Sequence, residues 1–304
     1  MRRDSSKMKA NESKAVEYTS AKVKRRIVDV IVHIFLTILA IIWIAPIAWT
    51  ILLSFRHEIG VNVTTIIPKS FTLDNYRKLF EDTTGGINFP QAFMNTLIIS
   101  IIVCIISSFF VLSVAYCMSR LRYRMRKTYM NVCMILGLFP GFMSMIAIYF
   151  ILKAFGLTEG ELLRVALILV YSGGTGMGFY VAKGFFDTIP KTLDEAACID
   201  GATKFQVFTK IIIPLSKPII VYTILTSFMG PWLDFIFAKV LCGVESEYYT
   251  VAICLYKMIT EKEFTDAWFN SFCAGGVLIS IPISIIFISM QKFYADGMSG
   301  AVKG

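Results

Sequence analysis

The segment Phe93 to Ser119 reads FMNTLIISIIVCIISSFFVLSVAYCMS and contains no Asp, Glu, Lys or Arg. A helix of about 20 mainly apolar residues crosses the roughly 30 Å of hydrocarbon in a bilayer, because a helix satisfies its backbone polar groups within the segment. This run is long enough to do so. It therefore predicts a membrane-spanning helix.

The same pattern recurs along the chain in five further stretches. They are Ile34 to Leu53, Tyr129 to Leu152, Val165 to Ala182, Ile219 to Leu241 and Ala267 to Met290. Hydrophobic residues make up 56% of the 304 residues and charged residues 17%, against about 45–50% and about 25% in soluble proteins. We therefore predict an all-α integral membrane protein with six transmembrane helices. The first apolar run is longer than the core of a signal peptide, so we expect it to remain as an anchor.

The positions of Lys and Arg indicate how the spans are oriented. Thirty Lys and Arg against 21 Asp and Glu give a net charge of +9, and nine of the 30 fall within residues 1–26. Five more lie in 120–127, and four lysines lie in 187–218. Because basic residues are retained on the cytoplasmic side, we expect these three segments and both termini there. A nucleic-acid-binding protein explains the charge less well, because the charge is divided among loops between apolar spans.

The same signals divide the chain into sections. We predict a basic cytoplasmic segment (1–26), a first transmembrane helix (27–53), an extracellular segment (54–91), a core of five transmembrane helices (92–291) with the loop 187–218, and a cytoplasmic tail (292–304). The extracellular segment also holds four basic residues, but its greater length keeps their density low. The prediction is a multi-pass protein of the cytoplasmic membrane, in contact with membrane lipid.

No residue pattern in the sequence predicts catalysis, a metal or a cofactor. The seven cysteines form no C-x-x-C pair, and two histidines are too few for the usual zinc or haem sites. There is no G-x-x-x-x-G-K-[ST] phosphate loop. The glycine-rich stretch 173–178 lacks the following Lys-Ser or Lys-Thr, so we interpret it as close helix packing. Gly137 and Gly141 around Pro140 predict packing and a kink.

The loop 187–218 predicts two short helices. Thr192 and Glu195 have the spacing of a capping box, and we expect the helix that they open to end at Gly201 in the left-handed conformation. Thr203 and Gln206 form a second capping box. We expect the second helix to have an apolar face and to end at Pro214. The residues of that face are Phe205, Phe208, Ile211 and Ile212.

The residues of this loop resemble a known motif. Glu195-Ala196-Ala197, then Gly201, then Ile213-Pro214-Leu215 resemble the EAA loop of ATP-binding-cassette (ABC) importer permeases, with isoleucine where leucine is usual before the proline. The resemblance implies that the loop docks on a separate ATPase subunit. Glu195 would then make polar contacts, Ala196 and Ala197 would permit close approach, Gly201 would form the turn, and Pro214 would complete the motif. The alternative is an amphipathic hairpin on the lipid surface, which needs no such small residues.

Two further stretches narrow the resemblance. Pro68 to Tyr76 and Trp232-Leu233-Asp234-Phe235 resemble segments of the shorter permease subunit of maltose and maltodextrin importers, although Leu233 departs from the usual pattern. The chain's ending, residues 291–304, is also similar to the C-terminus of that subunit. The resemblance implies the type I ABC importer fold, no catalysis in this chain and four kinds of contact: a second permease, two ATPase subunits, an extracellular sugar-binding protein and lipid.

The fifth span contains a candidate translocation path. Asp234 is an acid deep within an apolar stretch, and Gly230 and Pro231 just before it predict a broken helix with free carbonyls. Trp232 has a ring able to stack on a sugar, although packing is the commoner role. Alternatively, Asp234 only satisfies the freed backbone groups. Two other functions stay open: a secondary transporter with Asp234 as proton site, which the absence of paired intramembrane acids disfavours, and an ABC permease for another solute.

Overall fold

The computed structural model describes residues 2–60, 65, 67–174, 178–261 and 265–301, with side chains described from Arg25 to Phe293 apart from residue 174 and the gaps. Its regular elements are helices, and the described residues outside them include one isolated antiparallel bridge between Arg56 and Phe71. This confirms the predicted all-α fold. The chain divides into unit 1, up to Leu53, and unit 2, from Ser54 onward.

Unit 1 is a single helix, α1 (Arg2–Ser54), which also contributes its last residue to unit 2. Its apolar part, Arg25–Ser54, contains the predicted first span and is long enough to cross a membrane. Most of the large apolar side chains in this part are exposed, including Phe35 and Trp43. Exposed apolar side chains all round a helix suit a lipid environment. The side chains of the basic residues up to Lys24 lie outside the described part.

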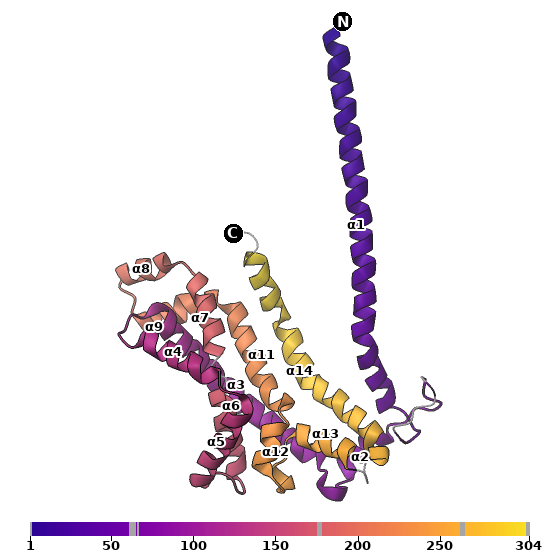
Figure 1. The fold of residues 1–304 in the computed structure, drawn as a ribbon, viewed down its shortest axis with the longest axis vertical. Helices are drawn as coiled ribbons and strands as arrows, with labels where there is room; N and C mark the ends of the chain where they lie inside the picture. Colours follow the sequence, from indigo (N-terminus) through magenta and orange to yellow (C-terminus); the bar gives the residue numbers. More distant parts are fainter. Residues whose placement is uncertain (1, 61–64, 66, 175–177, 262–264, 302–304) are drawn as a thin grey trace. The chain divides into compact units, whose positions relative to one another are not determined.

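Unit 2 contains the remaining helices (Figure 1). They are α2 (Asp74–Glu81), η1 (Thr84–Gly86), α3 (Phe89–Arg120), α4 (Arg126–Gly137), α5 (Gly141–Ala154), α6 (Leu162–Gly174), α7 (Gly178–Thr188), α8 (Lys191–Ile199), α9 (Lys204–Val207), the π-helical η3 (Phe208–Ile212), α10 (Ile213–Leu215), α11 (Lys217–Leu233), α12 (Ile236–Cys242), η4 (Ser246–Tyr248), α13 (Val251–Thr260) and α14 (Thr265–Ala301). Within this unit α8 and α9 lie at one end and α5 and α12 at the other; we call these the α8 end and the α12 end.

The number of membrane spans depends on how bent helices are counted. Among the described residues, four stretches are long and apolar enough to cross a membrane alone: Arg25–Ser54, Thr84–Arg120, Leu162–Thr188 and Thr265–Phe293. Two bent pairs pass the same test: α4 with α5, at 101°, and the stretch Lys204–Leu215 with α11, at 84°. Counting each pair as one span gives six. This equals the predicted number, although the predicted fifth span, Ile219 to Leu241, covers α11 and α12 and not the stretch Lys204–Leu215.

The bend between α4 and α5 lies at the predicted position. Pro140 stands between the two helices and has no N–H to continue the ladder of hydrogen bonds. The predicted kink is therefore confirmed. Close packing by Gly141 is not observed, because no atom of another described residue lies within 4 Å of a Cβ added there. Gly178 of the other glycine-rich stretch makes ordinary contact with Val111, at 3.7 Å from an added Cβ; residues 175–177 lie outside the described residues.

The core of unit 2 is built around α3, which packs against α11, α7 and α6. Three buried clusters follow one another along it. Phe89 and Ala92 pack with α11, α13 and α14; Ile99 and Val103 pack with α6 and α12; Ala115 packs with α7 and η3. Because α3 contributes to all three clusters, it links the α12 end of unit 2 to the α8 end.

Gly275 allows α14 to approach this core closely. A Cβ added at Gly275 would lie 2.7 Å from Cδ2 of Leu255 and 3.1 Å from Cε2 of Phe89, whereas one added at Gly276 meets nothing within 4 Å. We predict that Gly275→Val lowers the stability of the detergent-solubilised protein by about 1–3 kcal/mol, the usual cost of overpacking. Gly276→Val is the matched control. Equal melting temperatures for the two variants, measured by a thermal shift of intrinsic fluorescence, would contradict this packing.

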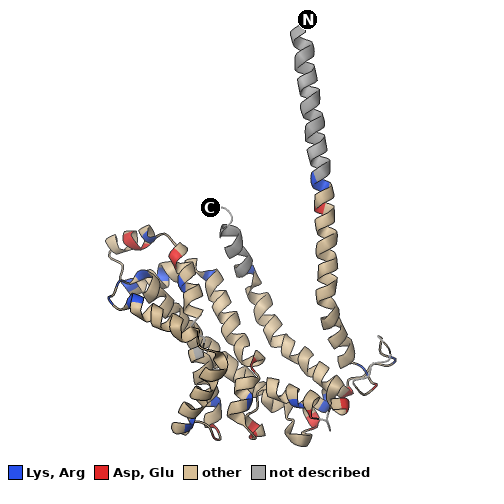
Figure 2. Ribbon diagram, in the orientation of Figure 1, with Lys and Arg blue, Asp and Glu red and all other residues tan. Residues whose placement is uncertain are grey.

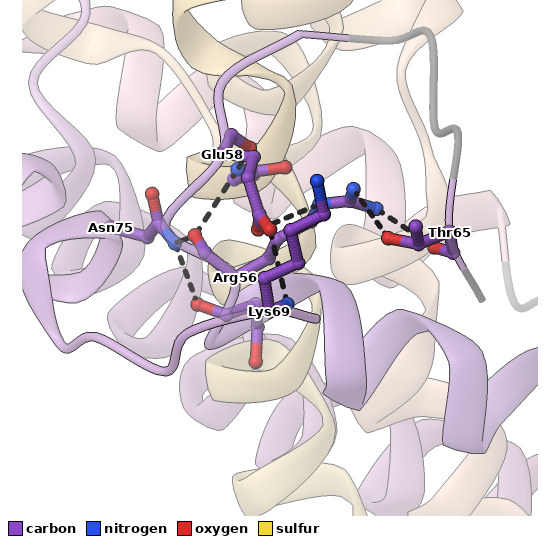
Figure 3. Close-up of polar contacts among 7 residues, drawn as sticks. Arg56, Glu58, Thr65, Lys69 and Asn75 are labelled. Atoms are coloured by element: carbon purple, nitrogen blue, oxygen red, sulfur yellow. Dashed lines mark hydrogen bonds and ion pairs between the residues drawn. The ribbon is translucent and has the colours of Figure 1, made fainter. Parts of the chain in front are cut away.

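A polar network fixes the segment after α1 to the rest of unit 2 (Figure 3). Arg56 is buried, and its Nε lies 3.1 Å from the Glu58 carboxylate. The Asn75 amide donates to the carbonyls of Ser54 and Arg56, at 3.0 and 2.7 Å. Asn270 of α14 donates to the carbonyls of Arg56 and Glu58, at 3.3 and 2.7 Å. Two amides from distant parts of the sequence therefore satisfy the backbone of this irregular segment.

The same network lowers the pKa of the Glu58 carboxyl. The largest cause is a hydrogen bond from the backbone N–H of Glu58 itself; burial opposes it, and the Lys69 backbone N–H and the Arg56 guanidinium add to it. Hydrogen bonds and a nearby positive charge favour the ionised form. Glu58 is therefore ionised at neutral pH. Its ion pair with Arg56 weakens only at a pH below the one at which a glutamate side chain ordinarily takes up a proton.

Candidate coupling loop and translocation path

Helix α8 begins differently from the prediction. It starts at Lys191, with Pro190 in the N-cap position and no side-chain cap, so the Thr192–Glu195 capping box is wrong. The physical reason is that Pro190 precedes the helix and fixes its start, which places Thr192 inside the first turn. A capping side chain must stand before the helix to accept from the N3 backbone N–H. Glu195 therefore does not take part in a capping box, and its side chain is exposed.

The turn after α8 confirms the prediction for Gly201. Its φ is +85°, in the left-handed region that favours glycine. The backbone N–H of Gly201 donates to the Cys198 carbonyl and that of Ala202 to the Ala197 carbonyl, at 3.1 and 2.9 Å. These bonds satisfy the last carbonyls of α8. Nothing lies within 4 Å of a Cβ added at Gly201, so glycine is required here for its conformation and not for space.

The second helix of the loop begins as predicted and ends later. The Thr203–Gln206 capping box is confirmed. The backbone N–H of Thr203 donates to Oε1 of Gln206 at 2.7 Å, and the backbone N–H of Gln206 donates to Oγ1 of Thr203 at 3.2 Å. Pro214 does not end the helix. The preceding five residues widen into the π-helical η3, where the Ile213 N–H donates to the Phe208 carbonyl, and the helix runs on to Leu215. A π-turn relieves the contact between a proline ring and the preceding turn.

The predicted apolar face of this helix is wrong at one position. Ile212 is fully buried, and the ring of Phe208 lies 4.6 Å from that of Tyr116. Phe205, however, is 73% exposed. The loop helix therefore buries Val207 and Ile212 against α3 and α7 and turns Phe205 outward.

The predicted motif residues lie on an exposed surface of the loop. Glu195, Ala196, Gly201 and Pro214 are exposed, and Ala197 is half-buried. Three large apolar side chains of the loop are exposed too: Leu193, Ile199 at 86% and Phe205. We call Leu193, Glu195, Ala196, Ile199 and Phe205 the α8 surface. Exposed apolar side chains that lie together are typical of surfaces that contact another protein or a membrane.

Residues outside the predicted motif hold this loop in place. Arg120, at the end of α3, is buried and lies 3.4 Å from the carboxylate of Asp194 in α8. The Tyr116 hydroxyl donates to the Lys204 carbonyl at 2.8 Å. An open cleft of about 700 Å³ lies beside these contacts, with Glu195 and Lys204 in its lining. No local pattern in the sequence identifies these contacts, because Arg120 and Asp194 lie on different helices and far apart in the chain.

Asp234 lies at a break between two helices. Helix α11 continues through Gly230 and Pro231 to Leu233, and α12 begins at Ile236. The predicted break is therefore present, three residues after Pro231. Asp234 accepts from the Tyr171 hydroxyl at 2.6 Å and from the backbone N–H groups of Phe237 and Ala238 at 3.3 and 3.0 Å. It thus satisfies free N–H groups at the start of α12, which is the alternative role considered for it.

Three of the four predicted path residues line one cavity. Gly230, Pro231 and Asp234 surround a space of about 280 Å³, together with Tyr171, Ser227 and Phe237 among others. Trp232 is absent from this lining. It is buried in the cluster around α3 and α11, where its ring lies 5.2 Å from that of Phe93 in an edge-to-face arrangement. The packing interpretation of Trp232 therefore fits the structure, and Tyr171 is the residue that sequence reasoning missed.

The contacts of Asp234 predict a large effect on stability. Asp234→Ala removes the acceptor of three donors, and each buried donor left unpaired costs about 1–3 kcal/mol. We expect a clearly lower melting temperature of the purified protein, with Asp234→Asn intermediate because its amide keeps one acceptor oxygen. Glu159→Ala, at an exposed acid, is the control. An unchanged melting temperature for Asp234→Ala would show that these bonds do not stabilise the break.

These features define a class. The described residues contain apolar helices of spanning length, two bent helix pairs, a broken helix beside a mainly apolar cavity, and an exposed loop held by a buried ion pair. Together these are the parts of a multi-span membrane permease. The chain matches the family model described as "Binding-protein-dependent transport system inner membrane component" over residues 112–300, and it belongs to that family.

Similar proteins agree with this assignment. The chain is 34% identical to the galactooligosaccharides transport system permease protein GanQ of Bacillus subtilis, over 93% of this chain and 98% of that one. It is 33% identical to the maltodextrin transport system permease protein MalD of Streptococcus pneumoniae, over 94% and 99%. The crystal structure of a bacterial ABC transporter for import of alginate contains a chain with the same fold, at a TM-score of 0.69, 22% identity and coverage of 88% and 97%. The chain is a membrane permease subunit of the sugar ABC importer family.

Proposed function

We propose that this subunit imports an oligosaccharide of the maltodextrin type, driven by separate ATPase subunits that dock on the α8 surface. The observation that carries the proposal is the contrast between the two sides of α8. Glu195, Ala196 and Ile199 are exposed, whereas Asp194 ties the same helix to the end of α3. A helix that is exposed on one side and fixed on the other is suited to receive motion and pass it on.

The charge distribution supports a cytoplasmic position for the α8 end. Lys and Arg gather in unit 2 at the start of α4 and around α9, close to α8 (Figure 2). The basic residues of 120–127 and 187–218 contribute to this group. Since such residues are retained in the cytoplasm, the α8 surface faces the compartment that contains ATP. The α12 end then faces the sugar-binding protein, and a second permease completes the pathway, as in the importer family.

The cavity beside Asp234 is our candidate for part of the translocation path. It lies between α3, α6, α11 and α12, and α11 and α12 meet there at a break. A broken helix at membrane depth is tolerated where it lines a cavity. Alternating access then consists of a shift of these helices that opens the cavity to one side and afterwards to the other. The names of the relatives, which include galactooligosaccharide and maltodextrin permeases, support an oligosaccharide as cargo.

A secondary transporter with Asp234 as its proton site is the main alternative. Both carboxylate oxygens of Asp234 already accept hydrogen bonds, one from Tyr171 and the others from the start of α12. This arrangement favours a structural carboxylate over one that exchanges protons. An amphipathic hairpin on lipid is the alternative for the loop, and the small residues Ala196, Ala197 and Gly201 disfavour it.

Reconstitution distinguishes these functions. The subunit is purified with its co-expressed partners and placed in proteoliposomes with a sugar-binding protein, and uptake of labelled maltodextrin is measured with ATP on the α8 side or with a proton gradient alone. We expect uptake with ATP and none with the gradient. Uptake driven by the gradient without ATPase subunits would overturn the proposal, and a panel of labelled oligosaccharides defines the cargo.

A further inference from the structure

The last turn of α3 makes a three-point attachment to the coupling loop. Tyr116, Ser119 and Arg120 lie at i, i+3 and i+4, so they occupy one face of the helix. Each of them contacts a different part of the segment from α7 to α9. The attachment lies at the α8 end of unit 2, because Arg120 contacts Asp194 of α8 and Tyr116 contacts the first residue of α9.

Arg120 is the centre of this attachment. Its side chain is only 2% exposed, and its Nη2 donates to the carbonyls of Phe186 and Ile189, at 2.6 and 2.8 Å. These carbonyls lie at the end of α7, where the following Pro190 has no N–H to offer. A cation at a helix C-terminus is also favoured by the helix dipole. Arg120 therefore fixes the corner at which α7 turns into α8.

The same guanidinium holds α8 through Asp194. Nη1 of Arg120 lies 3.4 Å from Oδ2 of Asp194, whose side chain is 13% exposed. Among the described residues, Nε and Nη1 of Arg120 and Oδ1 of Asp194 have no hydrogen-bond partner, so the two side chains meet as an ion pair without a hydrogen bond. Asp194 provides a negative charge beside the buried guanidinium, which the carbonyls of Phe186 and Ile189 solvate from the other side. Removing one leaves the other uncompensated in a poorly solvated place, which is strongly unfavourable.

The two neighbouring contacts complete the attachment. Ser119 donates to Oδ1 of Asp187 at 2.5 Å, and Lys183 of α7 lies 2.5 Å from the other oxygen of that carboxylate. Tyr116 bonds the Lys204 carbonyl at the start of α9. Both ends of the loop are therefore held on α3, and α8 cannot shift without moving α3 and α7 or breaking these contacts.

We propose that Arg120 is the positioning residue that transmits movement of α8 to α3 and α7, through its ion pair with Asp194. The inference rests on the proposed function and adds the physical link between the ATPase docking surface and the transmembrane helices. Asp194 precedes Glu195 directly in α8, so a force on the docking surface acts next to the ion pair. The three helices move together because the two buried charges keep them in one arrangement.

A double-mutant cycle in the assembled transporter tests this link. Arg120→Ala, Asp194→Ala and the double variant are purified with their ATPase partners, and sugar uptake per ATP hydrolysed is measured in proteoliposomes. We expect each single variant to lower this ratio by about tenfold, and the double variant to be no worse than either single variant. Asp194→Glu is expected to restore most of the ratio, whereas Arg124→Ala, at an exposed arginine of the same loop, leaves it unchanged.

The outcomes separate this inference from the proposed function. Absence of ATP-driven uptake in the wild-type complex would overturn the proposed function itself. An unchanged ratio in the variants, with wild-type uptake intact, would overturn only the role of Arg120. Loss of ATPase subunits from the variant complexes in proportion to the loss of uptake would show that the ion pair only keeps the complex assembled, and it would overturn the role of Arg120 too. If the alanine variants do not insert, Arg120→Lys and Asp194→Asn replace them, since Lys lacks the planar fork that reaches both carbonyls and the carboxylate.

Discussion

Replacing Glu195 by Lys is expected to lower ATP-driven sugar uptake by about tenfold or more while leaving the permease in the membrane. Glu195 is exposed on α8, between the apolar Leu193 and Ile199, so it makes no contribution to folding that the substitution would remove. At a docked interface the reversed charge meets the groups that had paired with the carboxylate, which costs several kcal/mol for a desolvated pair. The measurement is uptake in proteoliposomes together with the amount of ATPase that co-purifies.

Glu195→Gln is the matched control for this prediction. Glutamine keeps the length and the hydrogen-bonding capacity of the side chain but not its charge. We expect it to retain more uptake than the lysine variant and to co-purify with the ATPase. Wild-type uptake in the Glu195→Lys variant would show that this position does not face a partner, and it would favour a lipid-facing hairpin.

Gly201→Pro is expected to abolish uptake. The φ of +85° at this position is inaccessible to proline, which is restricted to about −65°, and proline also removes the N–H that bonds the Cys198 carbonyl. The turn between α8 and α9 then cannot close in its present form, and Glu195 and Phe205 are no longer held on one surface. The variant should still insert, because the spanning helices do not depend on this turn. Membrane fractionation and uptake measure the two properties separately.

A graded series makes the conformational cause visible. Gly201→Ala adds only a Cβ, with the left-handed strain of about 1–2 kcal/mol, and should reduce uptake in part. Gly184→Ala, inside α7 with nothing within 4 Å of the added Cβ and no positive φ, should leave uptake intact. Equal uptake in the Gly201→Pro, Gly201→Ala and Gly184→Ala variants would contradict a requirement for this turn.

The sequence predicted well those features that depend on local composition. An uncharged run such as Phe93 to Ser119 specifies a spanning helix without help from the rest of the chain, because the membrane imposes the same rule on every segment. The Thr203 capping box and the left-handed Gly201 are equally local, since the residues concerned lie within four positions of one another. Pro140 predicted the bend between α4 and α5 for the same reason.

Features that depend on competition between signals were predicted less well. Thr192 and Glu195 have the spacing of a capping box, but Pro190 sets the start of the helix and displaces them. Pro214 was expected to end a helix, yet a π-turn accommodates it while Val207 and Ile212 remain packed against α3 and α7. Phe205 has the spacing of a buried apolar position, but in the fold its side chain is exposed. In each case tertiary contacts or a neighbouring proline outweighed the local pattern.

Residues that act through partners far away in the sequence could not be found from spacing. Tyr171 and Asp234 form a hydrogen bond although they are 63 residues apart in the sequence. Helices α4 to α7 lie between Arg120 and Asp194 in the chain, and yet the two form an ion pair. The basic residues of 120–127 all give the same topology signal, and only the fold distinguishes Arg120, whose side chain is 2% exposed, from the exposed Arg122, Arg124 and Lys127. The candidate site on α8 was therefore visible in the sequence, whereas the residues that hold it were not.

A cross-link from the α8 surface tests directly whether an ATPase subunit docks there. A photoreactive amino acid at Ala196, which is exposed on α8, is irradiated in intact membranes with and without ATP, and the products are identified by mass spectrometry. We expect a product that joins this subunit to a nucleotide-hydrolysing protein, with a yield that changes with ATP, and no such product from the same label at Phe109 within α3. Cross-links from Ala196 to lipid alone would contradict it.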